Sequence, residues 1–201
     1  MRHWLRKRRW FNDAGRNYIL MGKRSSFDRV PRDYYPTPIE AVVPLIAHLP
    51  YFFTYAEPCA GDGRLIQHIT NLTDCGGQCD YAADIEPKAN TIRTANALDI
   101  KPSVGKSVDF CITNPPWDRK ILHPLIESWM CVCPTWFLFD ADWMHTKQSA
   151  TLITYCSKIV SVGRVKWIEG SKNTGKDNCA WYLFDINKKP DLPAVFYGRT
   201  V

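Results

Sequence analysis

The sequence predicts an α/β fold with a mostly parallel sheet of about seven strands and an antiparallel hairpin at the C-terminal end. Helix-like and strand-like segments alternate along the chain after residue 33. The last two apolar segments, residues 160–167 and 179–185, flank the polar loop IEGSKNTGKDN, as the strands of a hairpin do. The length of 201 residues fits a single domain with a substantial core.

The first helix is expected over residues 37–49. Thr37 is a suitable N-cap, Pro38 suits the first helical position, and Glu40 completes a capping box. Two further helices are expected, one from residue 65 and one over residues 146–157.

Strands are assigned to short runs of β-branched and aromatic residues that end at turn signals. The expected strands are residues 52–56, 81–85, a short stretch within 91–100, 108–113, 134–140, 160–167 and 179–185. Residues 74–80, with two successive glycines, are expected to form a loop. Ligands of open α/β sheets bind at the carboxyl ends of strands, so the segments after the first, second and fourth strands should share one crevice.

Positive charge is concentrated at the N-terminal end. Residues 1–32 hold ten Lys and Arg against two Asp, a balance of +8, whereas the other 169 residues hold sixteen against eighteen, or −2. The opening MRHWLRKRRWF also mixes aromatic residues with arginines, which is typical of arms that bind phosphates and stack on bases. We therefore divide the chain into a basic arm, residues 1–32, and one folded domain, residues 33–201. The arm is expected to contact nucleic acid through Arg6, Lys7, Arg8 and Arg9, the alternative being a solubilising tail.

Several classes of protein are disfavoured. The eight cysteines include no C-x-x-C pair, and no histidines stand at zinc-finger spacing, so we expect reduced thiols and no metal. Asp140 and Asp142 lack a third ligand and are assigned to substrate contact or structure. The apolar region 41–56 is interrupted by two prolines and a histidine, and the N-terminus lacks a signal-peptide core. These features predict a cytoplasmic protein without a membrane span.

A glycine-containing turn, EPCAGDG, follows the first strand. Gly61 and Gly63 let the backbone approach a ligand where a Cβ would collide. Asp84 ends the next strand, 21 residues beyond Gly63, where a carboxylate can accept from both ribose hydroxyls of an adenosine-containing ligand. Ile85 is placed to cover one face of the adenine. The alternative for Asp84 is a cap ahead of Glu86.

The segment Asn114-Pro115-Pro116-Trp117 follows the fourth strand. The exocyclic amine of a nucleobase is a poor nucleophile, because its lone pair is delocalised into the ring. The side-chain carbonyl of Asn114 and the backbone carbonyl of Pro115 can each accept one amine proton, and the two prolines hold both acceptors fixed. Trp117 offers a flat surface for the ring. The segment therefore predicts chemistry on an aromatic amino group.

These motifs resemble the gamma group of N6-adenine DNA methyltransferases, in particular the small stand-alone type of phages and prophages. NPPW matches the [DN]-P-P-[YFW] signature of that group, EPCAGDG its cofactor loop, and ADIEP its acidic strand end. DYYPTP, residues 33–38, matches the F-x-T-P-type segment upstream. The order of cofactor loop before NPPW is also that of the gamma group, and the likeness covers residues 33–185.

The resemblance implies a class I, Rossmann-like methyltransferase that transfers a methyl group from S-adenosylmethionine directly to N6 of a flipped-out adenine in DNA. It implies a catalytic segment formed by Asn114, Pro115, Pro116 and Trp117. It also implies a set of cofactor-binding residues: Tyr35, Thr37, Glu57, Cys59, Ala60, Gly61, Gly63, Asp84, Ile85, Asn96 and Ala97.

Individual roles follow from the same resemblance. Thr37 would contact the methionine end of the cofactor, and Glu57 would position its ammonium. Asn96 stands where relatives place an Asp that accepts from the cofactor adenine, with Asp99 as the alternative. Arg119, Lys120 and Trp167 would contact nucleic acid, although Trp167 fits core packing equally well. The loop lysines Lys166, Lys172 and Lys176 fit either phosphate contact or a solvated loop.

The same signature also occurs in enzymes that methylate guanine N2 in ribosomal RNA or a glutamine amide in release factors. The basic arm disfavours a protein substrate but does not separate DNA from RNA. A catalytically idle DNA- or cofactor-binding relative is the rival from another class. No separate recognition domain fits this length, so recognition would come from loops, the arm, a partner or a second copy, in the cytoplasm of a bacterial or phage-infected cell.

Overall fold

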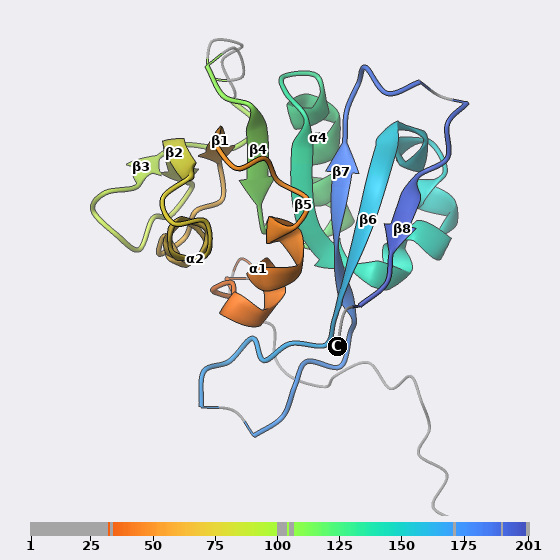
Figure 1. Ribbon diagram of the computed structural model, residues 1–201. Coiled ribbons are helices and arrows are strands. Elements are labelled where there is room, and N and C mark those ends of the chain that lie inside the picture. Colours follow the sequence, from red (N-terminus) through yellow and green to blue (C-terminus); the bar gives the residue numbers. More distant parts are fainter. Residues whose placement is uncertain are drawn as a thin grey trace, which may run out of the picture.

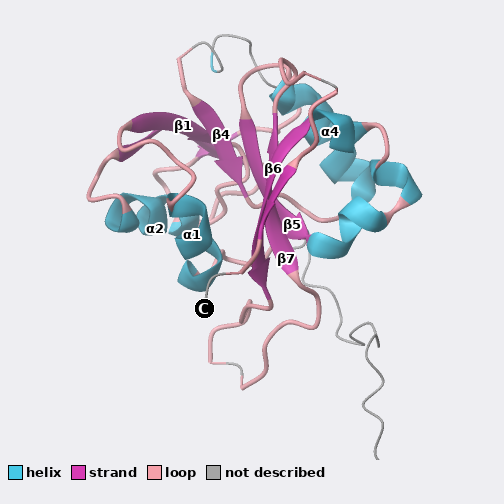
Figure 2. Ribbon diagram, turned by 45° about the vertical axis from the view of Figure 1, so that its right-hand side comes forward, coloured by secondary structure: helices cyan, strands magenta, loops and turns pink. Residues whose placement is uncertain are grey.

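An eight-stranded sheet forms the centre of the molecule, with helices on both faces (Figures 1 and 2). The computed structural model describes residues 32, 34–99, 104, 107–170, 172–189 and 191–199. The arm residues Arg6, Lys7, Arg8 and Arg9 lie outside the described residues.

The order of elements is that of an alternating α/β chain. The helices are α1 (Ile39–Ile46), α2 (Arg64–Leu72) and α4 (Arg119–Met130), with 3₁₀ helices η2 (Ala141–His145), η3 (Lys147–Ser149) and η4 (Leu152–Tyr155). The strands are β1 (Phe53–Glu57), β2 (Gly77–Asp84), β3 (Arg93–Thr94), β4 (Phe110–Thr113), β5 (Thr135–Asp140), β6 (Cys156–Gly163), β7 (Cys179–Phe184) and β8 (Val195–Tyr197).

The strand order across the sheet is β3-β2-β1-β4-β5-β7-β6-β8. β7 runs antiparallel to both β5 and β6, and the other strand pairs recorded in the described ranges are parallel. The predicted fold class, a mostly parallel sheet with a C-terminal antiparallel hairpin, is therefore confirmed. β8 is an addition to the seven predicted strands; its three residues are too few to show an alternating pattern, and Val195 and Phe196 are exposed at the sheet edge.

Two apolar cores sandwich the sheet, as expected when helices cover both faces. On one face, α1 and α2 pack with Leu45 and Ile69 against Trp136 and Leu138 of β5. The opposite core holds the buried side of α4 together with the alternate β5 residues Phe137 and Phe139. Figure 2 shows α1 and α2 on one side of the sheet and α4 on the other.

The predicted loop at residues 74–80 is wrong in its second half, because β2 begins at Gly77. The two glycines permit a close approach of strands. A Cβ added to Gly76 would lie 2.2 Å from the backbone oxygen of Tyr51, and the backbone N–H of Phe53 donates to the carbonyl of Gly76 at 3.0 Å. The glycines here let two chain segments approach closely at the start of paired strands. The sequence alone does not distinguish this use of glycine from its use in a turn.

The predicted helix at residues 146–157 is also wrong. The segment forms two short 3₁₀ helices and the start of β6, which spans Cys156–Gly163 and not residues 160–167. The Ser149 hydroxyl donates to the backbone oxygen of Thr146 at 2.7 Å, and the Thr154 hydroxyl donates to that of Thr151 at 2.7 Å. Such local side-chain bonds compete with the α-helical ladder.

Helix α4 was not predicted from the sequence, although its cap is well formed. The side chain of Asp118, directly after NPPW, accepts from the backbone N–H of Lys120 at 3.0 Å. The helix then buries Leu122, Ile126 and Trp129. Pro124 inside the helix hides its helical pattern, since proline normally signals a break.

In the part of the chain that the structure describes, membrane-spanning helices, disulfides and clusters of metal ligands are absent. No helix there is long and apolar enough to cross a membrane. Its eight cysteines are all free, and no three of its His, Cys, Asp or Glu side chains gather to hold a metal ion.

The β1–β2 approach generates a stability prediction. Gly76→Ala should lower the free energy of unfolding by about 2 kcal/mol or more, because the new methyl group collides with backbone that cannot move without disrupting the sheet. Gly198→Ala is the matched control: nothing lies within 4 Å of its Cβ position, and its effect should stay within about 0.5 kcal/mol. Urea titration followed by circular dichroism measures both, and equal midpoints would contradict the packing argument.

Candidate active site at the carboxyl ends of the strands

A cavity of about 770 Å³ lies where β1, β2 and β4 end. Its wall is formed by the segment before α1, the EPCAGD turn after β1, the residues after β2, residues 96–98, and the NPPW segment after β4. The single crevice expected from these strand ends is therefore present.

Most residues predicted to bind the cofactor line this cavity. They are Tyr35, Thr37, Glu57, Cys59, Ala60, Gly61, Asp84, Ile85, Asn96 and Ala97, joined by Asn114 and Pro116 of the NPPW segment. Gly63 does not line it; with φ of 82° it is instead the N-cap of α2, in a conformation that suits glycine. Pro115, Trp117, Arg119, Lys120 and Trp167 also lie outside the wall.

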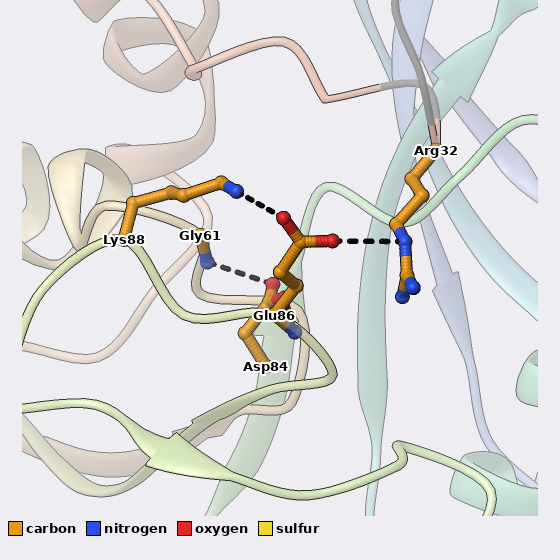
Figure 3. A network of polar contacts seen from close by, with 5 residues as sticks. All are labelled: Arg32, Gly61, Asp84, Glu86 and Lys88. Atoms are coloured by element: carbon orange, nitrogen blue, oxygen red, sulfur yellow. Dashed lines mark hydrogen bonds and ion pairs between the residues drawn. The ribbon is translucent and has the colours of Figure 1, made fainter.

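Asp84 ties the glycine turn to the end of β2 (Figure 3). One carboxylate oxygen accepts from the backbone N–H of Gly61 at 2.9 Å, and the other accepts from that of Glu86 at 2.8 Å. The backbone N–H of Lys88 also donates to the carbonyl of Gly61 at 2.8 Å. The alternative of a helix cap for Asp84 is wrong, because residues 85–92 form no helix; Asp84 instead caps a turn, and each oxygen keeps a lone pair for a ligand.

Tyr34 covers the glycine turn, a role that was not predicted from the sequence. A Cβ at Gly61, whose φ is +54°, would lie 2.9 Å from Cε2 of the Tyr34 ring. Burial, followed by the charge and hydrogen bond of Asp62, raises the pKa of the Tyr34 hydroxyl. The sequence feature that could have predicted this contact is Gly61, because a turn residue without a Cβ leaves room for another side chain to pack on the backbone.

Two ion pairs join Arg32, Glu86 and Lys88, which also line the cavity (Figure 3). Arg32 Nε lies 2.9 Å from one oxygen of Glu86, and the Lys88 ammonium lies beside the other. The hydrogen bond and charge of Lys88, and then the charge of Arg32, lower the pKa of the Glu86 carboxyl. Because these side chains are about half exposed, screening keeps the ion pairs weak.

Glu57 is the least expected group in the cavity wall. Its side chain is 2 % exposed, and within the described ranges its Oε2 has no hydrogen-bond partner. Burial, and then the negative charges of Asp62 and Asp84, raise the pKa of the Glu57 carboxyl well above its ordinary range. A buried, unpaired carboxyl beside a cavity is complementary to a cationic ligand.

Cys59 stands in the same wall. Burial, followed by the negative charge of Asp84, raises the pKa of its thiol to about 12. The thiol is therefore protonated at neutral pH and a poor nucleophile.

Asn114 is held on both sides of its amide. The Nδ2 group donates to the backbone carbonyl of Tyr35 at 3.3 Å and to the hydroxyl of Thr37 at 3.2 Å, while Oδ1 accepts from the indole N–H of Trp117 at 3.3 Å. Thr37 does not cap α1 as predicted. The helix begins at Ile39 with Pro38 as N-cap, and proline has no side-chain group that could form a cap bond. The Thr37 side chain, 5 % exposed, lies one residue earlier and is bound to Asn114.

Trp167 belongs to an aromatic group beside the NPPW segment. Its ring meets that of Trp117 edge-on, with centroids 5.6 Å apart and planes at 89°, and that of Tyr35 at 6.5 Å and 62°. It therefore contacts the candidate site, and it is also packed against a core cluster. Arg119 and Lys120 are exposed at the start of α4.

The structure distinguishes Asn96 from Asp99 and gives Asp140 a structural role. Asn96 lines the cavity, with Oδ1 accepting from the backbone N–H of Leu98 at 3.1 Å, whereas Asp99 lies outside the wall. Asp140 accepts from the backbone N–H of Asp142 at 2.9 Å and thereby caps η2.

No protein-family model matches this sequence, and a comparison with curated protein sequences finds no match. Solved structures do match. A Listeria monocytogenes protein assigned to the class I S-adenosylmethionine-dependent methyltransferases superposes with a TM-score of 0.54 at 14% identity, over 88% of this chain and 68% of its own.

A methyltransferase subunit of a type I restriction-modification system from Streptococcus thermophilus gives a TM-score of 0.56 at 11% identity, over 82% of this chain. A modification subunit assigned to a type I restriction enzyme of Vibrio vulnificus gives 0.50 at 12% identity, over 84%. This chain spans 47% of the length of each of these two subunits.

The chain has the class I methyltransferase fold. At these identities the likeness concerns the fold alone. Within the class I methyltransferase fold seen here, the cavity occupies the carboxyl ends of the parallel strands, which is the usual ligand position in open α/β sheets.

Glu57 generates a prediction about stability and pH. Its pKa is raised in the folded protein, so folding is favoured most below the ordinary carboxyl pKa, and the free energy of unfolding falls as pH rises through the folded pKa. Glu57→Gln removes this ionisation. The Tm of the variant should exceed that of the wild type by about 3 °C or more at pH 8, and this difference should shrink toward pH 4.

The measurement is thermal unfolding across this pH range without added ligand. Glu127→Gln, at an exposed position on α4, is the matched control. A Tm difference for Glu57→Gln that stays constant with pH would rule out the buried carboxyl as its cause.

Proposed function

We propose that the protein is an S-adenosylmethionine-dependent methyltransferase acting on N6 of adenine in DNA. The observation that carries the proposal is the Asn114 amide, which is fixed by three hydrogen bonds at the wall of a cavity lined by a glycine turn and an acidic strand end. A preorganised acceptor of this kind suits an amino group as its target.

The cavity fits the cofactor in several respects. Glu57 is a buried carboxyl without a partner in the described residues, suited to the cofactor's ammonium. Asp84 keeps free lone pairs for the ribose hydroxyls, and Ile85, 56 % exposed, offers an apolar surface to the adenine. Asn96, and not Asp99, is the wall residue available to the adenine edge. When bound, S-adenosylmethionine supplies a methyl group on a sulfonium, which the target amine attacks in line.

The chain's own residues act on the amine. One lone pair of Asn114 Oδ1 is taken by Trp117, which leaves the second for one amine proton, and we assign the other amine proton to the Pro115 carbonyl by the family resemblance. Both contacts return electron density to the nitrogen. Asn114 does not need to act as a base, because the alkylated amine is strongly acidic and loses its proton to solvent after transfer. The target base leaves the duplex stack to reach this acceptor.

DNA is favoured over RNA as substrate by two further observations. The gamma-group order of motifs is one, and the other is that two of the similar folds are subunits of restriction-modification systems. The basic arm, residues 1–32, supplies the charge for phosphate contact, since residues 33–201 carry a balance of −2. Recognition of the target sequence is assigned to loops, the arm, a partner or a second copy.

Asn114→Ala should lower methyl transfer at least about 100-fold, because the amine loses its preorganised acceptor. The assay uses labelled S-adenosylmethionine with DNA and, separately, RNA; digestion then identifies the methylated nucleoside. Calorimetry on the same samples should show unchanged cofactor binding. Asn71→Ala, exposed on α2, is the matched control. Wild-type turnover by Asn114→Ala would refute the assignment, and a methylated nucleoside other than N6-methyl-2′-deoxyadenosine would redirect it.

Deletion of residues 1–31 should weaken DNA binding and flatten its salt dependence. Each lost phosphate contact should reduce the slope of log K against log salt by about 0.7–0.9. The full-length chain with Arg6, Lys7, Arg8 and Arg9 all changed to Gln tests the charge without shortening the chain. A salt titration by fluorescence anisotropy measures both variants, and identical curves for the variants and the wild type would show that the arm does not bind phosphate.

A further inference from the structure

The Asn114 side chain has almost no free hydrogen-bonding capacity. A carboxamide has two N–H donors and two oxygen lone pairs. Both donors are used, one by the Tyr35 carbonyl at 3.3 Å and one by the Thr37 hydroxyl at 3.2 Å, and one lone pair is used by the indole N–H of Trp117 at 3.3 Å. A single lone pair remains.

Two of these partners, the Tyr35 carbonyl and the Trp117 indole N–H, determine which end of the amide is oxygen, because the Thr37 hydroxyl can either accept or donate. In the flipped orientation, Oδ1 would face the Tyr35 carbonyl, an acceptor against an acceptor. Nδ2 would then face the Trp117 indole N–H, a donor against a donor. The surroundings therefore hold the oxygen on the side of Trp117, where the ring of a target base is expected.

The orientation matters for the chemistry proposed above. An oxygen on that side accepts an amine proton and raises the electron density of the nitrogen. An amide nitrogen in the same place would direct N–H toward N–H and repel the amine. The carboxamide of Asn114 is thus competent in one of its two orientations only.

We propose that Thr37 and Trp117 are positioning residues for the Asn114 amide, an inference that rests on the proposed function. Trp117, together with the Tyr35 carbonyl, sets which end of the amide is oxygen, and the Thr37 hydroxyl fixes the position of the amide group. For Thr37 this differs from the cofactor contact that the family resemblance implies. For Trp117 the role adds to any stacking, because it uses the indole N–H, which a Phe or Tyr ring lacks.

The local structure supports this use of Thr37. Thr37 lies one residue before the N-cap of α1, which is Pro38, and its buried hydroxyl accepts from Asn114. Prolines on both sides of Thr37 restrict its backbone. On the other side of the amide, the edge-on contact with Trp167, at 89°, holds the Trp117 ring in place.

The test compares Thr37→Val with Thr37→Ser. Valine keeps the volume but removes the acceptor, so the rate of methyl transfer in a single turnover should fall about tenfold, the equivalent of one hydrogen bond. Its Kd for S-adenosylmethionine should stay within about twofold, since the loss concerns the acceptor and not the cofactor. Serine keeps the hydroxyl and should restore the rate to within about threefold of the wild type.

Thr135→Val is the matched control. It also removes a buried hydroxyl, which donates to the Cys133 carbonyl at 2.9 Å, but at the start of β5, away from the strand ends that form the cavity. It should lower stability and leave the rate unchanged. If Thr37→Val weakens cofactor binding and leaves the single-turnover rate intact, Thr37 is a cofactor contact and the inference is wrong.

A second measurement does not depend on activity. The indole N–H signal of Trp117 in a ¹⁵N spectrum is assigned by its disappearance in Trp117→Phe. It should move in Asn114→Ala, which removes the acceptor, and in Thr37→Val, but not in Thr135→Val. An unchanged signal in the first two variants overturns the inference. A wild type that transfers no methyl group refutes the proposed function, while the shifts still decide whether Thr37 and Trp117 hold the amide.

Discussion

The hydrogen bond that the Asp84 carboxylate accepts from the glycine turn joins two walls of the cavity. The N–H of Gly61 reaches the carboxylate only because this residue adopts a φ of +54°, and the same conformation leaves room for the Tyr34 ring. Tyr34 begins the segment that supplies the Tyr35 carbonyl and the Thr37 hydroxyl to Asn114. The ligand side and the acceptor side of the site are therefore parts of one connected structure.

The parts of the fold and the candidate site that could be predicted from the sequence were those marked by short motifs or local residue patterns. NPPW, the EPCAGDG turn and Asp84 each follow an apolar strand, and the carboxyl ends of parallel strands meet at one edge, so their convergence followed from topology. The missed parts depend on tertiary contacts. The Thr37 hydroxyl binds Asn114, far along the chain, while Pro38 takes the N-cap position of α1. Gly76, just before β2, lies against the backbone of Tyr51, and Pro124 is tolerated within a helix that buries Trp129.

The charges of the cavity wall differ from those of the N-terminal arm. Glu57, Asp62 and Asp84 make the cavity acidic, which suits a cationic ligand and leaves Glu57 unfavourably buried when no cation is present. The net positive charge of the chain comes from residues 1–32, which carry a balance of +8, although Arg32 and Lys88 also line the cavity. Under the proposed function, the buried Glu57 carboxyl lowers the stability of the protein without ligand and raises its affinity for a cationic ligand, as is common in binding sites.

Cys59 shows a further consequence of burial beside these negative charges. A thiolate is among the strongest nucleophiles in proteins, and an electrophilic methyl donor bound beside one would alkylate the protein itself. Burial and the nearby carboxylates hold the pKa of Cys59 at about 12, so at neutral pH the sulfur keeps its proton. Under the proposed function, burial of Cys59, aided by the nearby carboxylates, also serves as chemical protection, because it leaves the incoming amine as the better nucleophile in reach of the donor.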